Sequence, residues 1–288
     1  MISDSARLSI ATLLRTFPFR IAITWTLTLV ETTMFALLPL LIGLSIDGLL
    51  NDNWDPFLNL IMALAGLLAV AIARRVYDTR AYGTMRVELG KSLVARAGDK
   101  PVSITNARVL MGRELVDFLE VTAPETLTAI VQILLSVVIL LSFHGTLALA
   151  ASGAAIGIVI IYALFSRFFL RINTALNTQM EGQVTAIESR DITRVATHFL
   201  GLRRAEVRMS DLESLVYGLI FLVLLTMLAF NLWFATTQSG ATPGQIFSIV
   251  SYSYEFVQAA VALPAALQAL TRLKEITERI NRDEGEAA

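Results

Sequence analysis

The feature that most constrains this chain is the length of its stretches without a charged side chain. Residues 126–166 and 214–254 each run for 41 positions without Asp, Glu, Lys or Arg. A helix that spans a bilayer needs about 20 predominantly apolar residues. Each stretch is therefore long enough for two spanning helices, and Gly-containing breaks at 143–146 and 238–244 indicate where the turns between them lie.

Further apolar stretches extend this pattern and predict an all-α membrane protein with six transmembrane helices. Hydrophobic residues make up 55% of the chain and charged residues 16%, against about 45–50% and about 25% in a typical soluble domain. The length leaves little room for a second domain. The predicted spans are residues 20–46, 57–80, 118–143, 146–168, 213–237 and 244–270.

The basic residues are confined to one side of the predicted membrane. All 23 Lys and Arg residues fall in four groups, at residues 7–20, 74–113, 167–208 and 272–282, each at or beyond the same end of the predicted spans. Cytoplasmic loops carry an excess of Lys and Arg. We therefore expect a multi-pass protein of the bacterial inner membrane, with both termini and the two long connections in the cytoplasm.

The two cytoplasmic connections are too rich in helix-forming residues to be simple linkers. Residues 74–125 and 167–213 contain few Gly or Pro, whereas Leu, Val, Ala, Arg and Glu dominate them. Each connection is interpreted as a helical hairpin that extends the neighbouring spans beyond the membrane. The tips of the hairpins are predicted at residues 98–101 and near Asp191.

The N-terminal segment has no long apolar core and no small-residue cleavage site, so it is not expected to be a cleaved signal. Residues 1–17 are instead predicted to form an interfacial elbow helix whose apolar face carries Ile10, Leu13 and Phe17. Residues 18–288 are predicted to form the six-helix transmembrane domain with its helical extensions.

Three local motifs add a resemblance to a known family. Residues 39–48, 242–247 and 272–280 are similar to the end of the first span, the start of the sixth span and the exit from the sixth span in the transmembrane domain of ABC exporters. With its six spans, elbow helix and two hairpins, the chain resembles that domain over about residues 4–282. The resemblance implies a homodimer in which twelve spans surround one central cavity.

The ATPase chemistry of that family has no counterpart in the sequence. A phosphate-binding loop needs the pattern G-x-x-x-x-G-K-[ST], and the first Gly of the pattern before Gly90-Lys91-Ser92 would fall on Met85. Pro101 is followed by no aromatic pair, which the family often uses to dock its ATPase. The chain also resembles a small group of bacterial permeases that keep this architecture, lack the ATPase and use the proton gradient, in some cases to take up peptides.

Two acidic residues inside the predicted spans are the main candidates for function. Glu31 lies about ten residues into span one and Glu255 about eleven into span six, roughly 15 Å deep in each case. An ionisable group at mid-bilayer costs at least about 2.5–3.5 kcal/mol, so it normally faces a cavity or a partner. No Lys or Arg in a span is expected to pair with either residue, which favours the protonated carboxyl. The predicted substrate- and proton-binding set is Glu31, Glu255, Tyr252, Gln258, Ser251 and Thr28.

These observations favour a transporter over an enzyme. With no Cys and two distant His residues, His144 and His198, we expect no metal site and no cofactor, and the net charge of −1 gives no support for a nucleic-acid partner. The leading hypothesis is a homodimeric, proton-coupled transporter without its own ATPase that moves a peptide-like or amphipathic small molecule. The alternatives are a permease subunit whose ATPase is a separate chain, and a membrane receptor or scaffold in which the two Glu residues only tie helices together.

Overall fold

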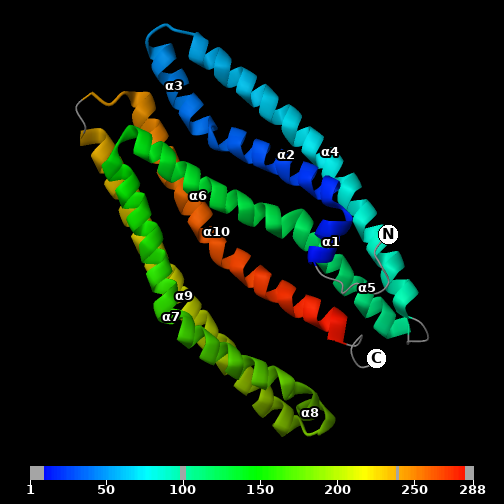
Figure 1. The fold of residues 1–288 in the computed structure, drawn as a ribbon. Helices are drawn as coiled ribbons and strands as arrows, with labels where there is room; N and C mark the ends of the chain where they lie inside the picture. The colour runs from blue at the N-terminus through cyan, green and yellow to red at the C-terminus, as the bar shows by residue number, and fades with distance from the viewer. Residues whose placement is uncertain (1–9, 98–101, 238–239, 283–288) are drawn as a thin grey trace. The chain divides into compact units, whose positions relative to one another are not determined.

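A computed structural model describes residues 10–97, 102–237 and 240–282, with side chains for most of them up to residue 262. All regular secondary structure in these residues is helical (Figure 1). The helices are α1 (Ile10–Thr16), α2 (Pro18–Ala36), α3 (Leu38–Leu50), α4 (Asp55–Ala97), α5 (Val102–Asp117), the π-helical turn η1 (Phe118–Thr122), α6 (Ala123–Phe143), α7 (Gly145–Glu181), α8 (Gln183–Glu188), α9 (Ile192–Thr237) and α10 (Pro243–Arg282).

The described part of the chain contains five helical segments long and apolar enough to cross a membrane. This confirms the prediction of an all-helical, multi-pass membrane protein. The sixth predicted span, residues 244–270, runs along α10, a single helix of 40 residues. Its side chains beyond residue 262 lie outside those described, so the sixth span stays a prediction.

Several helices continue well past the length that a bilayer requires. Helix α4 has 43 residues and α9 has 46, whereas about 20 suffice to span a membrane. Residues 98–101, the predicted first hairpin tip, lie outside the described residues. At the second predicted tip, residues 189–191 turn the chain between α8 and α9, and the Asp191 carboxylate accepts a hydrogen bond from the Thr193 N–H at 2.9 Å.

The chain divides into two compact units. The first comprises Met1–Phe143 and Ala235–Ala288, and the second comprises His144–Phe234. In the second unit α7 and α9 pack against each other. A Cβ added at Gly157 of α7 would lie 3.5 Å from a methyl carbon of Val223 on α9, and the rings of His144 and Phe234 are 4.8 Å apart.

The first unit has a core at the end of the bundle that carries α1. Leu13 of α1 packs with Tyr82 and Met85 of α4 and with Leu115 and Leu119 of α5 and η1, and all five side chains are buried. Fully burying a large apolar side chain contributes about 1.5–3 kcal/mol. This cluster therefore fixes α1, α4 and α5 relative to one another.

A break between α2 and α3 divides the first predicted span into two helices. Pro39 lies in the first turn of α3, where its ring nitrogen cannot donate a hydrogen bond back to α2. Thr24, Thr28 and Thr32 are spaced one turn apart on the buried face of α2. These three hydroxyl groups form a polar line along the buried face of α2.

Candidate functional site

Glu31 has a cationic partner, so the prediction that no Arg could pair with it is wrong. The Glu31 Oε2 atom lies 2.5 Å from Nε of Arg74 on α4, and Arg74 also donates a hydrogen bond to the Thr28 hydroxyl at 3.2 Å. Arg74 directly follows the charge-free stretch 57–73 in sequence. Because long side chains on a helix lean toward its N-terminus, the guanidinium reaches back into that stretch.

This ion pair lies at a partly enclosed position between α2 and α4. The side chains of Arg74 and Glu31 are 30% and 23% exposed, so neither charge is fully removed from solvent. A pair of this kind neutralises the Glu31 carboxylate without the large desolvation cost of a deeply buried pair. Arg74 therefore connects α4 to both Glu31 and Thr28 of α2.

Glu255 has a different kind of partner. The amide of Gln132 on α6 donates a hydrogen bond from Nε2 to the Glu255 Oε2 atom at 2.7 Å. None of the ion pairs among the described side chains includes Glu255. An amide carries both a donor and an acceptor, so Gln132 can hydrogen-bond to the carboxylate or, after turning over, to the protonated acid.

A hydrogen bond between two threonines connects the surroundings of the two acids. The Thr32 and Thr128 hydroxyls are 3.0 Å apart and join α2 to α6. Thr32 follows Glu31 directly, and Thr128 lies one turn before Gln132 on α6. This contact thus joins α2, which carries Glu31, to α6, which carries the hydrogen-bond partner of Glu255.

The other predicted site residues divide into buried and exposed ones. The Tyr252 side chain is fully buried, and its hydroxyl donates to the Ala36 carbonyl at 2.8 Å, where α2 ends. Tyr252 therefore connects α10 to α2 at the break between α2 and α3. Ser251 is partly buried, whereas Gln258 is exposed and donates to the Tyr254 hydroxyl at 2.6 Å.

A close contact also joins α3 to α10. The Asp47 carboxylate accepts a hydrogen bond from the Gly244 N–H at 2.8 Å and another from the Thr242 hydroxyl at 2.5 Å. It thereby caps the N-terminus of α10, where the helix dipole favours a negative charge. A Cβ on either Gly43 or Gly244 would collide with the backbone carbonyl of the other. Two of the three motifs behind the family resemblance therefore pack directly against each other.

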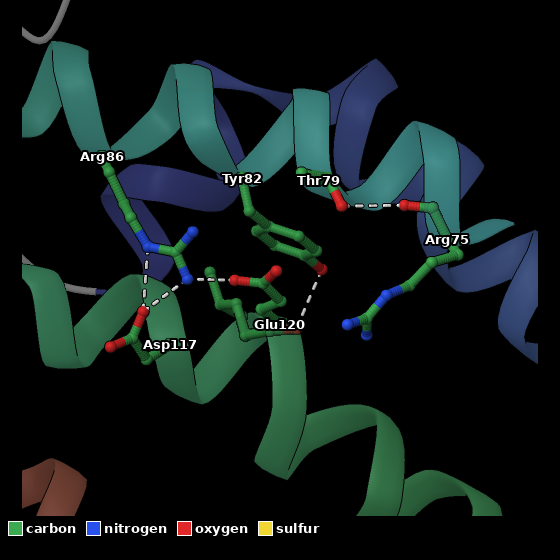
Figure 2. A network of polar contacts seen from close by, with 7 residues as sticks. Arg75, Thr79, Tyr82, Arg86, Asp117 and Glu120 are labelled. Carbon is green, nitrogen blue, oxygen red and sulfur yellow. Dashed lines mark hydrogen bonds and ion pairs between the residues drawn. The ribbon is translucent and has the colours of Figure 1, made fainter.

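A second polar cluster lies where α4 meets η1. Figure 2 shows Arg86 between two carboxylates: its Nε donates to Asp117 at 2.9 Å, and one terminal nitrogen donates to both Asp117 and Glu120. The Tyr82 hydroxyl donates to the Leu119 carbonyl at 2.8 Å. Leu119 lies within the π-helical turn, a feature frequent at functional sites. We found no sequence signal for this cluster beyond the charges themselves.

Gln132 contacts a predicted site residue but is not in the predicted site set. It is the only Asn or Gln in the charge-free stretch 126–166, and that isolation is the signal that could have found it. Among the described residues, no group of three or more His, Cys, Asp or Glu side chains could hold a metal ion.

Comparison with known proteins places the chain in a family. Residues 10–244 match the family described as the ABC transporter transmembrane region, which covers most of the 288 residues. No curated protein matches the chain. The matched range includes the Glu31–Arg74 pair, the Thr32–Thr128 bridge and Gln132. The chain belongs to the ABC transporter transmembrane region family.

Proposed function

We propose that this chain is a membrane transporter that works by alternating access as a homodimer and couples transport to the proton gradient. The substrate is a peptide-like or amphipathic small molecule, and the protein resides in the bacterial inner membrane with both termini in the cytoplasm. Membership of the ABC transmembrane family supports the transport role. Two copies are needed because six spans do not enclose a pathway in the resembled exporters.

The observation that carries proton coupling is the contact between Glu255 and Gln132. A carboxyl in an apolar helix needs a partner, and the partner here is a neutral amide at 2.7 Å. A cationic partner would hold the carboxylate in its charged form. A neutral amide can bond to either protonation state, so Glu255 can gain and lose a proton without breaking the packing of α6 on α10.

The second candidate function is a permease subunit whose ATPase is a separate chain, which also fits the family. Exposed apolar side chains at the α8–α9 turn favour it. Val184 is 64% exposed, Ile187 53% and Ile192 86%, and they flank the charged residues Arg190 and Asp191. Exposed apolar patches mark protein or membrane interaction sites, and this turn lies at the predicted cytoplasmic tip of a hairpin, away from the membrane.

A transport assay separates the two candidates. Purified protein in proteoliposomes should take up a short, fluorescently labelled amphipathic peptide when a pH gradient is imposed, and uptake should not require ATP. Glu125→Gln, at an exposed position on α6, should transport as well as the unmodified protein and serves as the matched control. Uptake that begins only after a co-expressed ATPase and ATP are supplied would contradict proton coupling and favour the permease subunit.

The proposed orientation can be tested independently because the chain has no native Cys. Cys at the exposed position Asn53 should react with a membrane-impermeant thiol reagent added from the periplasmic side. Cys at the exposed position Asn106 should react only after the membrane is opened. The reverse labelling pattern would contradict the orientation inferred from the basic residues.

A further inference from the structure

The corner between α1 and α2 keeps a helical path, so its side chains divide into two faces. The Phe17 N–H donates to the Leu13 carbonyl at 2.9 Å, and the Ile21 N–H donates to the Phe17 carbonyl at 3.1 Å. These bonds, each spanning four residues, carry the helix past Pro18 and into α2. Residues four positions apart therefore lie on the same side of the corner.

One face of the corner packs against the core of the first unit. Leu13 and Ile21 are buried in that core, and Ile10 and Phe17 pack against it. The apolar face that the sequence predicts for the elbow helix is therefore covered by protein. Any contact of the corner with lipid is made by the opposite face.

The opposite face exposes large apolar side chains beside arginines. Phe19 is 83% exposed and Leu14 is 38% exposed. Arg15 and Arg20 are exposed beside them. Phe19 lies one turn before Ile23, which is 45% exposed on the predicted span. Removal of a large apolar side chain from water is favourable, so Phe19 continues the lipid-facing side of span one.

The two arginines carry positive charge that no acidic side chain among the described ion pairs neutralises. Residues 10–30 contain no Asp or Glu, and none of those ion pairs includes Arg15 or Arg20. Arg74, which follows the charge-free stretch of α4, contacts Thr28 two turns after Arg20. The corner therefore lies at the predicted cytoplasmic end of the span, where anionic headgroups attract basic side chains.

We propose that this corner binds an anionic phospholipid, with Arg15 and Arg20 on the headgroup phosphate and Phe19 among the acyl chains. A guanidinium donates hydrogen bonds to phosphate oxygens in a fixed, forked geometry. An apolar ring beside basic side chains matches the boundary between headgroups and acyl chains. Phosphatidylglycerol is preferred to phosphatidylcholine, because the choline cation of the latter offsets the phosphate charge. This interaction goes beyond the proposed transport function and does not depend on proton coupling.

Local fluorescence quenching tests the contact with lipid. Replacing Trp25, Trp54 and Trp233 by Phe removes the native indoles, and Phe19→Trp then places one reporter at the corner. Brominated phosphatidylglycerol or brominated phosphatidylcholine, titrated into this reporter protein in neutral detergent, should quench the emission. The half-quenching concentration should be about 10- to 30-fold lower for phosphatidylglycerol, because two basic residues contribute. Equal half-quenching concentrations, or no quenching by either lipid, would overturn the proposal.

Variants of the reporter protein test the role of the two arginines. Arg15→Gln combined with Arg20→Gln should bring the ratio between the two lipids to about twofold or less. Arg194→Gln, at an exposed position near the predicted hairpin tip, is the matched control and should keep the full ratio. An unchanged ratio in the double variant, or an equal loss in Arg194→Gln, would overturn the proposal.

A competition experiment separates a lipid headgroup from free phosphate as the ligand. Sodium phosphate should relieve the quenching by phosphatidylglycerol no more than sodium chloride of equal ionic strength does, because both salts act by screening the exposed charges. Selective relief by phosphate would mean that the corner is a site for the free anion, and would overturn the proposal.

Native mass spectrometry of the unmodified protein tests the same site without a reporter, and replaces the quenching assay if the reporter protein does not fold. Arg15→Gln combined with Arg20→Gln should remove the preference for phosphatidylglycerol, whereas Phe19→Ser should weaken the binding of both lipids by a similar factor. Phe19→Ser that binds both lipids as well as the unmodified protein would overturn the acyl-chain contact. A double-Gln variant that loses its dimer and keeps its lipid preference would mean that the surface joins two copies of the chain, and would overturn the proposal.

Discussion

The two acidic residues that the sequence presents as equivalent lie in two different chemical environments. Glu31, between α2 and α4, is 2.5 Å from the Arg74 guanidinium. Glu255, between α6 and α10, is bonded to the neutral amide of Gln132 at 2.7 Å. Depth in a predicted span therefore does not by itself identify a proton carrier. The charge of the partner determines whether the carboxyl can gain and lose a proton, because a fixed cation holds a carboxylate in its charged form.

The largest expected effect on stability comes from breaking the charged pair. Arg74→Leu should lower the free energy of unfolding by about 1.5–3 kcal/mol, because it leaves the Glu31 carboxylate without its ion-pair partner. Unfolding monitored by circular dichroism in mixed micelles would measure this. Adding Glu31→Gln should recover part of the loss, because no unpaired charge then remains. An Arg74→Leu protein as stable as the unmodified one would mean that the pair does not hold α2 to α4.

The neutral pair should respond less in stability and more in the pH profile of transport. Gln132→Leu removes one hydrogen bond to the Glu255 carboxylate, for a cost of about 1–3 kcal/mol when the group stays charged. Because the lost donor favoured the carboxylate, the pH profile of gradient-driven uptake should move toward higher pH. Gln132→Asn, which keeps an amide, is the matched control. An unchanged profile in Gln132→Leu would contradict the assignment of this amide as the partner of Glu255.

The smallest effect is expected at the bridge between the two environments. Thr32→Val removes the hydroxyl contact with Thr128 and should cost about 0.5–1.5 kcal/mol, while Thr32→Ser should restore most of it. The same variant tests whether the two acids are coupled. In a double-mutant cycle, the combined effect of Glu31→Gln and Glu255→Gln on uptake should lie closer to the sum of the two single effects once the Thr32–Thr128 contact is removed. Identical coupling with and without the Thr32 hydroxyl would show that the Thr32–Thr128 contact does not couple Glu31 to Glu255.

Much of the fold follows from composition and from a few turn residues. The charge-free stretch 126–166 needed a turn near His144-Gly145, and the structure ends α6 at Phe143 and begins α7 at Gly145. The long helical continuation of the second predicted span is visible because no Gly or Pro interrupts residues 67–82. Such features depend on local chemistry that each segment carries in its own sequence.

The site depends on contacts that no local pattern contains. Asp47 caps α10 through Gly244, which lies 197 positions away along the chain, and no periodicity links the two. The Glu31–Arg74 pair was missed because Arg74 was counted with the loop that follows its span. A guanidinium on a long side chain can lie a full turn from its own backbone. The contact of Gln132 with Glu255 was not predicted because the two residues lie on helices more than a hundred residues apart in sequence.

We propose that Glu255 binds and releases the coupling proton, and Glu255→Gln tests this role directly. The substitution keeps the shape of the side chain and can still bond to Gln132, but it cannot carry a proton. Folded protein in proteoliposomes would be compared in two assays: peptide uptake driven by a pH gradient, and peptide exchange at equal pH. We expect Glu255→Gln to lose gradient-driven uptake and keep exchange, and Glu255→Asp to retain part of both. Full gradient-driven uptake by Glu255→Gln would show that Glu255 does not carry the coupling proton.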